Sequence, residues 1–220
     1  MARETAAARA ARALEILGVL DRTYPAAHCE LDYSTPLELL IATILSAQCT
    51  DKRVNIVTKE LFRVCKTAAD FVALPQEQLE EIIRTTGFFR AKAKNVKACC
   101  AAIVERHGGE VPRTMDELTK LAGVGRKTAN VVLGNAFGIN EGVVVDTHVQ
   151  RLSRRLGLTR AGTPEKIELE MMKLIPREKW ALFSHWLIWH GRRRCIARKP
   201  DCEHCELASL CPRVGVSTKA

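Results

Sequence analysis

The chain has 220 residues, which is enough for one sizeable domain or for two small lobes that each bury a core. Apolar residues make up 47% of it and no apolar run approaches the length of a membrane span, so composition disfavours both a disordered chain and a membrane protein. The formal net charge of +9 indicates a polyanionic partner, because clustered lysines and arginines release counterions from nucleic acid. Residues 1–12 lack the apolar core of a secretory signal, and we expect a cytoplasmic protein, nucleoid-associated if its source is prokaryotic.

Helical spacing of apolar residues predicts a first helix over residues 4–22. A second begins at Thr35-Pro36-Leu37-Glu38, which combines a capping hydroxyl, a proline at the first helical position and a glutamate three residues after the cap. It is apolar nearly all round, so we expect a central buried helix that ends at Ser46-Ala47-Gln48. Asp51 is expected to cap the next helix.

Three more helices are predicted up to Leu121. One short helix stops at Gly87, a longer one ends at Gly108-Gly109, and a third starts at Thr114, three residues ahead of Glu117, as in a capping box.

The stretch that follows joins two helical patterns through glycines and then presents a lysine; it reads Leu121-Ala122-Gly123-Val124-Gly125-Arg126-Lys127-Thr128-Ala129. Glycines let a turn adopt positive φ and let another backbone come close. The amides of Gly123, Val124 and Gly125, with the next helix N-terminus, can therefore face a phosphate without reading a base. Taken alone, the pattern fits a plain helix–helix turn with a solvated lysine about as well.

The remaining chain is also predicted to be helical. Val143-Val144-Val145 has no partner run elsewhere, so we interpret it as a buried connection rather than a strand. Asp146 stands where the next helix needs its cap, Thr163-Pro164-Glu165 begins another, and residues 180–190 form an apolar one. The predicted fold class is all-α, with a boundary near residues 138–142.

Four of the nine cysteines gather near the C-terminus, at Cys195, Cys202, Cys205 and Cys211, with six, two and five residues between them. Four thiolates in one short loop-rich segment indicate a common metal centre, either tetrahedral zinc or an iron–sulfur cluster. Structural zinc sites more often use two Cys-x2-Cys pairs, so a single compact run favours a cubane cluster over zinc, unligated thiols or disulfides.

Together these motifs resemble endonuclease III, a family of helix-hairpin-helix DNA glycosylases and abasic-site lyases. The resemblance rests on the cysteine spacing, on the hairpin with Lys127, on Val145-Asp146-Thr147-His148 and on Leu45-Ser46-Ala47-Gln48. It covers about residues 31–211, and the order and joint presence of the motifs make it specific.

The resemblance implies two helical lobes with a DNA-binding cleft between them. Residues 31–139 would form a six-helix barrel domain with the hairpin, and residues 1–30 plus 140–220 a domain carrying a [4Fe-4S] cluster. It further implies a monomer, not bound to a membrane, that removes oxidised pyrimidines from double-stranded DNA and cleaves the abasic site by β-elimination.

Within that resemblance Lys127 matches the catalytic lysine, which forms a Schiff base with the sugar, and Asp146 matches the catalytic carboxylate. Gln48 matches the residue that enters the space left by the flipped base, and Phe88 lies where relatives place an apolar wedge. Ala122 departs from the family pattern, where proline is frequent, but no hydrogen-bond donor is lost.

The resemblance also assigns DNA contacts to Gly123, Val124, Gly125, Thr128 and His148, and cluster ligation to Cys195, Cys202, Cys205 and Cys211. Ordinary roles stay open for several of these: a phosphate contact for Lys127, a helix cap for Asp146, and helix-end positions for Gln48 and Phe88.

Two other functions remain possible from the sequence. A monofunctional adenine-type glycosylase shares the fold and cluster but lacks the lysine nucleophile, so Lys127 argues against it. A noncatalytic helix-hairpin-helix module with a structural metal would bind DNA without cutting it.

Overall fold

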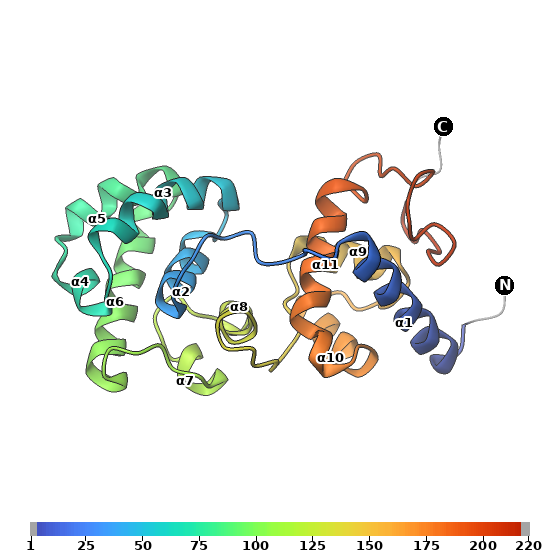
Figure 1. The fold of residues 1–220 in the computed structure, drawn as a ribbon, viewed down its shortest axis with the longest axis horizontal. Helices are drawn as coiled ribbons and strands as arrows, with labels where there is room; N and C mark the ends of the chain where they lie inside the picture. The colour runs from blue at the N-terminus through green and yellow to red at the C-terminus, as the bar shows by residue number, and fades with distance from the viewer. Residues whose placement is uncertain (1–3, 217–220) are drawn as a thin grey trace. The chain divides into compact units, whose positions relative to one another are not determined.

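The computed structural model describes residues 4–216, and within them every regular element is helical (Figure 1). The α-helices are α1 (Ala6–Thr23), α2 (Pro36–Leu45), α3 (Asp51–Val64), α4 (Ala68–Ala73), α5 (Gln76–Ile83), α6 (Phe89–His107), α7 (Met115–Thr119), α8 (Arg126–Ala136), α9 (Thr147–Arg155), α10 (Pro164–Leu174) and α11 (Trp180–Arg193). Two 3-10 helices, η1 (Arg84–Thr86) and η2 (Arg177–Lys179), complete the set. The predicted all-α fold class is confirmed.

The chain forms two compact units. One, here called the hairpin unit, is Cys29–Glu141, and the other, the cysteine unit, combines Met1–His28 with Gly142–Ala220. None of the helices in the described part is long and apolar enough to cross a membrane.

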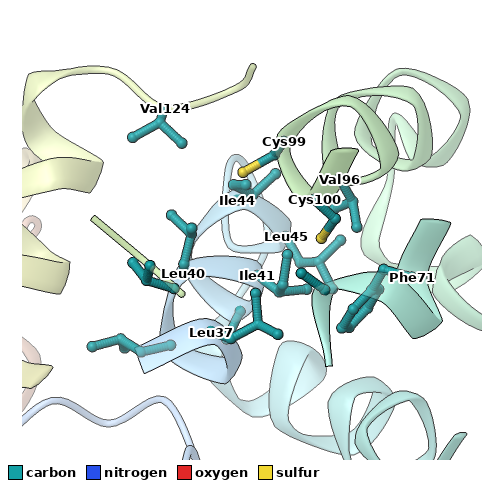
Figure 2. Close-up of a cluster of buried hydrophobic side chains, with 14 of the residues drawn as sticks. Leu37, Leu40, Ile41, Ile44, Leu45, Phe71, Val96, Cys99, Cys100 and Val124 are labelled. Atoms are coloured by element: carbon teal, nitrogen blue, oxygen red, sulfur yellow. The ribbon is translucent and has the colours of Figure 1, made fainter. Parts of the chain in front are cut away.

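The hairpin unit is built around α2, which is buried on nearly every side (Figure 2). Thr35 caps this helix by accepting a hydrogen bond from the Glu38 N–H at 3.2 Å, as the sequence predicts. Helices α3, α6 and α8 all contact α2, and Cys99 and Cys100 of α6 lie in the same apolar cluster as Leu45. Burial raises the pKa of the Cys99 thiol to about 12, so the pair behaves as neutral core side chains.

The cysteine unit packs α9 against α10 and α11, and α1 against α11. Its core includes Trp186 and Phe183 from α11, both almost fully buried, and the stretch Val143–Val145 runs through it without forming a strand. The interpretation of that stretch as a buried connection is confirmed.

Two details of the hairpin unit differ from the sequence-based expectation. Thr50, not Asp51, is the N-cap of α3, since its hydroxyl accepts from the Arg53 N–H and Asp51 is the first helical residue. Helix α4 was not predicted; Thr67 and Asp70 form a capping box around it, but six residues are too few to display a helical period.

Candidate functional site

The hairpin between α7 and α8 contains two glycines that play different parts. Gly123 has φ +76°, so the turn favours glycine, and a Cβ there would also make a tight contact of 3.0 Å with the Cβ of Asn95. Gly125 has an extended backbone with φ −93°, and a Cβ there would meet nothing within 4 Å. Gly123 therefore supplies the positive φ of the turn, whereas Gly125 leaves open space in front of α8.

Helix α8 begins after Gly125, which has no side chain to cap it. Within residues 4–216 no side chain caps it, and its first turn holds no acidic residue. Lys127 and Thr128 lie in that first turn, and Lys127 is exposed. An uncapped helix N-terminus next to a free approach at Gly125 is a site for an anion.

Val124 serves the hairpin itself. Its N–H donates to the Leu121 carbonyl at 3.1 Å and its side chain is buried. The geometry therefore gives the Val124 amide a partner inside the protein, and its contact with DNA stays a prediction.

Gln48 and Phe88 share an uncommon backbone conformation. Both are exposed and both have left-handed dihedral angles, with φ 53° and 49°. Phe88 exposes 69% of its surface. Such a conformation costs a residue with a Cβ roughly 1–3 kcal/mol and persists only where neighbouring structure enforces it. Two strained, exposed side chains in one unit are candidates for contact with a ligand.

Asp146 begins α9 in the cysteine unit. Its Oδ1 accepts a hydrogen bond from the Val149 N–H at 2.8 Å, and the carboxylate is half-buried. The predicted cap is confirmed. This cap uses one of the two carboxylate oxygens.

His148 lies one residue into the same helix and packs against α11. A Cβ at Gly191 would lie 2.8 Å from His148 Nδ1, so glycine is required where the two helices meet. Burial lowers the pKa of His148, and the nearby Asp146 carboxylate opposes that change. The side chain is half-buried, so it supports the α9–α11 contact whether or not it also reaches DNA.

Two arginines connect α9 to the first cysteine. Arg151 donates to the carbonyl oxygens of Gly191 and Cys195 at 3.0 and 3.1 Å. Arg155 donates to the carbonyl oxygens of Ile196 and Ala197, each at 2.8 Å, and to Cys195 Sγ at 3.3 Å. Sequence reasoning missed both residues, because an arginine-rich helix is typical of a solvated face and nothing local indicates a distant carbonyl.

The four C-terminal cysteines line one pocket together with apolar side chains that include Leu152, Leu156 and Leu207. None of the nine cysteines, all of them in the described part of the chain, is in a disulfide. Burial raises the pKa of Cys205 to about 11 and also raises that of Cys211. Buried thiols of this kind become thiolates when a metal centre supplies the compensating charge.

Hydrogen-bond donors toward the sulfurs complete the fit to such a centre. Besides Arg155, the Arg213 N–H donates to Cys211 Sγ at 3.4 Å. His190 Nε2 lies 3.5 Å from Cys205 Sγ, while its Nδ1 lies 3.0 Å from the Tyr24 hydroxyl. Donors of this kind stabilise charge on cluster sulfurs.

Comparisons with known proteins agree on what these features represent. Residues 41–177 match the HhH-GPD superfamily of base excision DNA repair proteins, and residues 195–211 match the iron-sulfur binding domain of endonuclease III. Endonuclease III of Synechocystis is 56% identical to this chain over 96% of each chain. The chain belongs to the endonuclease III family. Endonuclease III of Escherichia coli is 44% identical, covering 91% of this chain and 95% of its own.

Solved structures of endonuclease III have the same fold. A non-covalent endonuclease III–DNA complex is 47% identical, with a TM-score of 0.88 over 93% of this chain and 95% of the other. A trapped endonuclease III–DNA covalent intermediate is also 47% identical, with a TM-score of 0.85 over 91% of this chain and 96% of the other. The resemblance seen in the sequence is confirmed, and so is the [4Fe-4S] cluster as the cofactor of the cysteine segment.

Proposed function

We propose that the protein is a bifunctional enzyme of base excision repair, which removes oxidised pyrimidines from double-stranded DNA and then cleaves the abasic site. The observation that carries this function is an exposed lysine, Lys127, in the uncapped first turn of α8 directly after the hairpin. Support comes from the endonuclease III homologues and from the similar structure trapped as a covalent intermediate with DNA.

Lys127 supplies the nucleophile. Its unprotonated amine forms a bond to the sugar C1′ as the bond from C1′ to the base breaks, and the departing base takes the electron pair and a proton. Loss of a proton from the nitrogen gives an aminal, and the nitrogen electron pair then expels O4′, which takes up a proton, so that the sugar ring opens and a protonated imine forms at C1′. The imine acidifies the C2′ hydrogen, and its removal expels the 3′-phosphate by β-elimination. Hydrolysis of the imine then frees the lysine.

Asp146 supplies the negative charge that the reaction needs. Positive charge develops on the sugar as the base departs, and a fixed carboxylate stabilises it without reorganisation. The cap to Val149 holds one oxygen of Asp146, which orients the other.

Binding is assigned to the hairpin and to three further side chains. The N-terminus of α8, with Gly123, Gly125 and Thr128, holds a backbone phosphate, and Val124 shapes the turn. Gln48 and Phe88 fill the gap left by the flipped nucleotide, and His148 supports the site from α9.

The cysteine unit holds the cofactor, with Cys195, Cys202, Cys205 and Cys211 as its ligands. When bound, the cluster supplies iron–thiolate bonds that fix the segment between residues 195 and 211. We assign the six-helix barrel domain to the hairpin unit and the cluster domain to the cysteine unit. The protein acts as a monomer in the cytoplasm, on the nucleoid in a prokaryotic cell.

Borohydride trapping tests the function. The protein is incubated with duplex containing an abasic site or an oxidised pyrimidine, and reduction of the imine should leave one covalent protein–DNA adduct per active chain. Lys127→Ala should give neither adduct nor strand cleavage. Lys120→Ala is the matched control, because Lys120 is an exposed lysine of the same hairpin that pairs with Asp116 at 2.5 Å, and it should trap as the parent does.

Three outcomes would overturn parts of this function. An unmodified protein that binds DNA but never traps would be a noncatalytic module. Release of a base without trapping would indicate a monofunctional glycosylase. Full trapping by Lys127→Ala would assign the nucleophile to another amine.

A further inference from the structure

Lys92 is a buried lysine with an unusual environment. It lies in the first turn of α6 and exposes 5% of its surface. Its Nζ donates to the Leu45 carbonyl at 2.8 Å and to the Thr86 carbonyl at 2.7 Å. Across residues 4–216 no carboxylate forms an ion pair with it, so two neutral carbonyls are the hydrogen-bond acceptors of a buried ammonium group.

This placement is not explained by the local helix. The first turn of a helix is its positive end and disfavours a cation, and burial lowers the pKa of Lys92. A buried cation at such a position indicates that Lys92 serves the two segments that its ammonium group binds rather than α6 itself.

The two carbonyls that Lys92 binds belong to helix ends, and each helix end lies just before Gln48 or Phe88 in the chain. Leu45 is the last residue of α2, three residues before Gln48, and Thr86 is the last residue of η1, two residues before Phe88. The Cys49 N–H, which would continue the helix by bonding the Leu45 carbonyl, donates to Ser46 instead. The Lys92 ammonium therefore takes the place of a backbone donor at the end of α2.

Gln48 and Phe88 have left-handed backbones that neighbouring structure must enforce, as described above. Gly87, between Thr86 and Phe88, also has positive φ, at 72°. The ammonium of Lys92 joins the two segments directly, because it donates to Leu45 in one and to Thr86 in the other.

We propose that Lys92 is a positioning residue that holds Gln48 and Phe88 as one rigid element for entry into the DNA. The inference rests on the proposed function for the roles of these two side chains, although the link between the segments does not. Lys92 touches neither substrate nor the reacting atoms. It stabilises the arrangement in which two strained residues present their side chains together.

Lys92→Met tests the inference, because methionine has a similar length and suits an apolar core but cannot donate. Lys97→Met is the matched control. Lys97 lies on the same helix, and its ammonium also binds backbone carbonyls, those of Phe71, Val72 and Leu74 at the end of α4. Both variants lose an ammonium bound by carbonyls, but only Lys92→Met releases the Gln48 and Phe88 segments.

The first measurement is single-turnover excision of an oxidised pyrimidine. Lys92→Met should reduce this rate roughly tenfold or more, since small misplacements of positioning groups have effects of that size, whereas Lys97→Met should retain the parent rate. Trapping on a duplex that already contains an abasic site should change less than about threefold in Lys92→Met, because no base has to be flipped. Equal loss on both substrates, or in both variants, would make Lys92 a merely structural residue.

The second measurement is a comparison in the Gln48→Ala/Phe88→Ala background. If Lys92 acts through these two side chains, Lys92→Met should lower excision by less than about twofold once they are gone. If Lys92→Met lowers excision as much in this background as in the parent, the inference is overturned. If Lys92→Met does not fold, Lys92→Gln, whose amide can still reach one carbonyl, replaces it in the same cycle.

Hydrogen exchange separates this inference from the proposed function. Backbone amides of residues 47–50 and 87–89 should exchange faster in Lys92→Met than in the parent, and those of α4 should not. Faster exchange in a protein that excises nothing would refute the proposed function while leaving the link between the segments intact. Unchanged exchange at both segments would overturn the positioning role, whatever the parent protein excises.

Discussion

The Asp146 carboxylate accepts the Val149 N–H at 2.8 Å, so the side chain assigned to charge stabilisation is also the N-cap of α9. Asparagine and aspartate cap helices about equally well. Asp146→Asn should therefore leave thermal stability close to that of the parent while lowering the single-turnover rate of base release roughly 100-fold or more, because the charge is lost.

Thr163→Ala is the control for the cap. It removes the N-cap of α10 in the same unit and should cost about 1 kcal/mol of stability without affecting base release. A parent-like rate in Asp146→Asn would show that the carboxylate charge is not used in the reaction.

Substitutions at the two hairpin glycines should have different effects. Gly125→Val places its side chain in open space, so the protein should fold with unchanged stability but bind every duplex roughly tenfold or more weakly, because a phosphate can no longer approach α8. Gly123→Val should mainly lower stability, since φ is +76° and the added Cβ would lie 3.0 Å from the Cβ of Asn95. Thermal unfolding and titration with undamaged duplex measure the two effects.

Binding by the parent should also weaken steeply with added salt, as expected for phosphate contacts. A Gly125→Val protein that changed base preference at unaltered affinity would contradict the assignment of the hairpin to phosphate.

The cluster should depend on Arg155. Purified parent protein should be yellow-brown and contain roughly four irons and four sulfides per chain. Arg155→Met removes the donors to Ile196, Ala197 and Cys195 Sγ, so a chelator should extract iron faster than from the parent. Arg154→Met is the matched control, because Arg154 donates to the carbonyls of Ala161 and Gly162 instead. This variant should lose iron to the chelator at the rate of the parent.

Iron content also tests the ligand set. Cys202→Ala should reduce bound iron, lower the stability of the cysteine unit and weaken DNA binding. Zinc in place of iron in anaerobically prepared parent protein would refute the cluster.

Acid should destabilise the protein through His185. Burial lowers the pKa of His185 to about 4 and nearby His28 adds to the effect, whereas Asp146 opposes it. In the unfolded chain this histidine takes up its proton near pH 6.5, so the stabilising contribution is complete above that pH and is lost as pH falls toward 4.

The slope from this one group is at most about 1.4 kcal/mol per pH unit. Urea unfolding measures this effect. Between pH 7 and pH 4 the free energy of unfolding should fall more for the parent than for His185→Gln. Parallel curves for the two proteins would mean that His185 carries no part of the acid sensitivity.

Local chemistry explains what could be read from the sequence. Helix starts at Thr35, Thr114, Asp146 and Thr163 follow from side-chain oxygens that accept from backbone N–H groups three residues on, an interaction contained within one turn. The four cysteines lie in a 17-residue segment, from 195 to 211, so their spacing alone indicates a shared metal centre. Family-level motifs, in the right order, extended this to an endonuclease III fold.

Only the tertiary structure decided how the remaining side chains act. Lys92 reaches Leu45 across 47 positions and Arg155 reaches Cys195 across 40, and no local pattern encodes either partner. The left-handed backbones at Gln48 and Phe88 oppose the intrinsic preference of those residues, because contacts from elsewhere in the fold outweigh it. The sequence by itself therefore indicated most of the helices, the caps at Thr35, Thr114, Asp146 and Thr163 and the candidate reactive groups, whereas long-range packing determined which of those groups are buried, hydrogen-bonded or exposed.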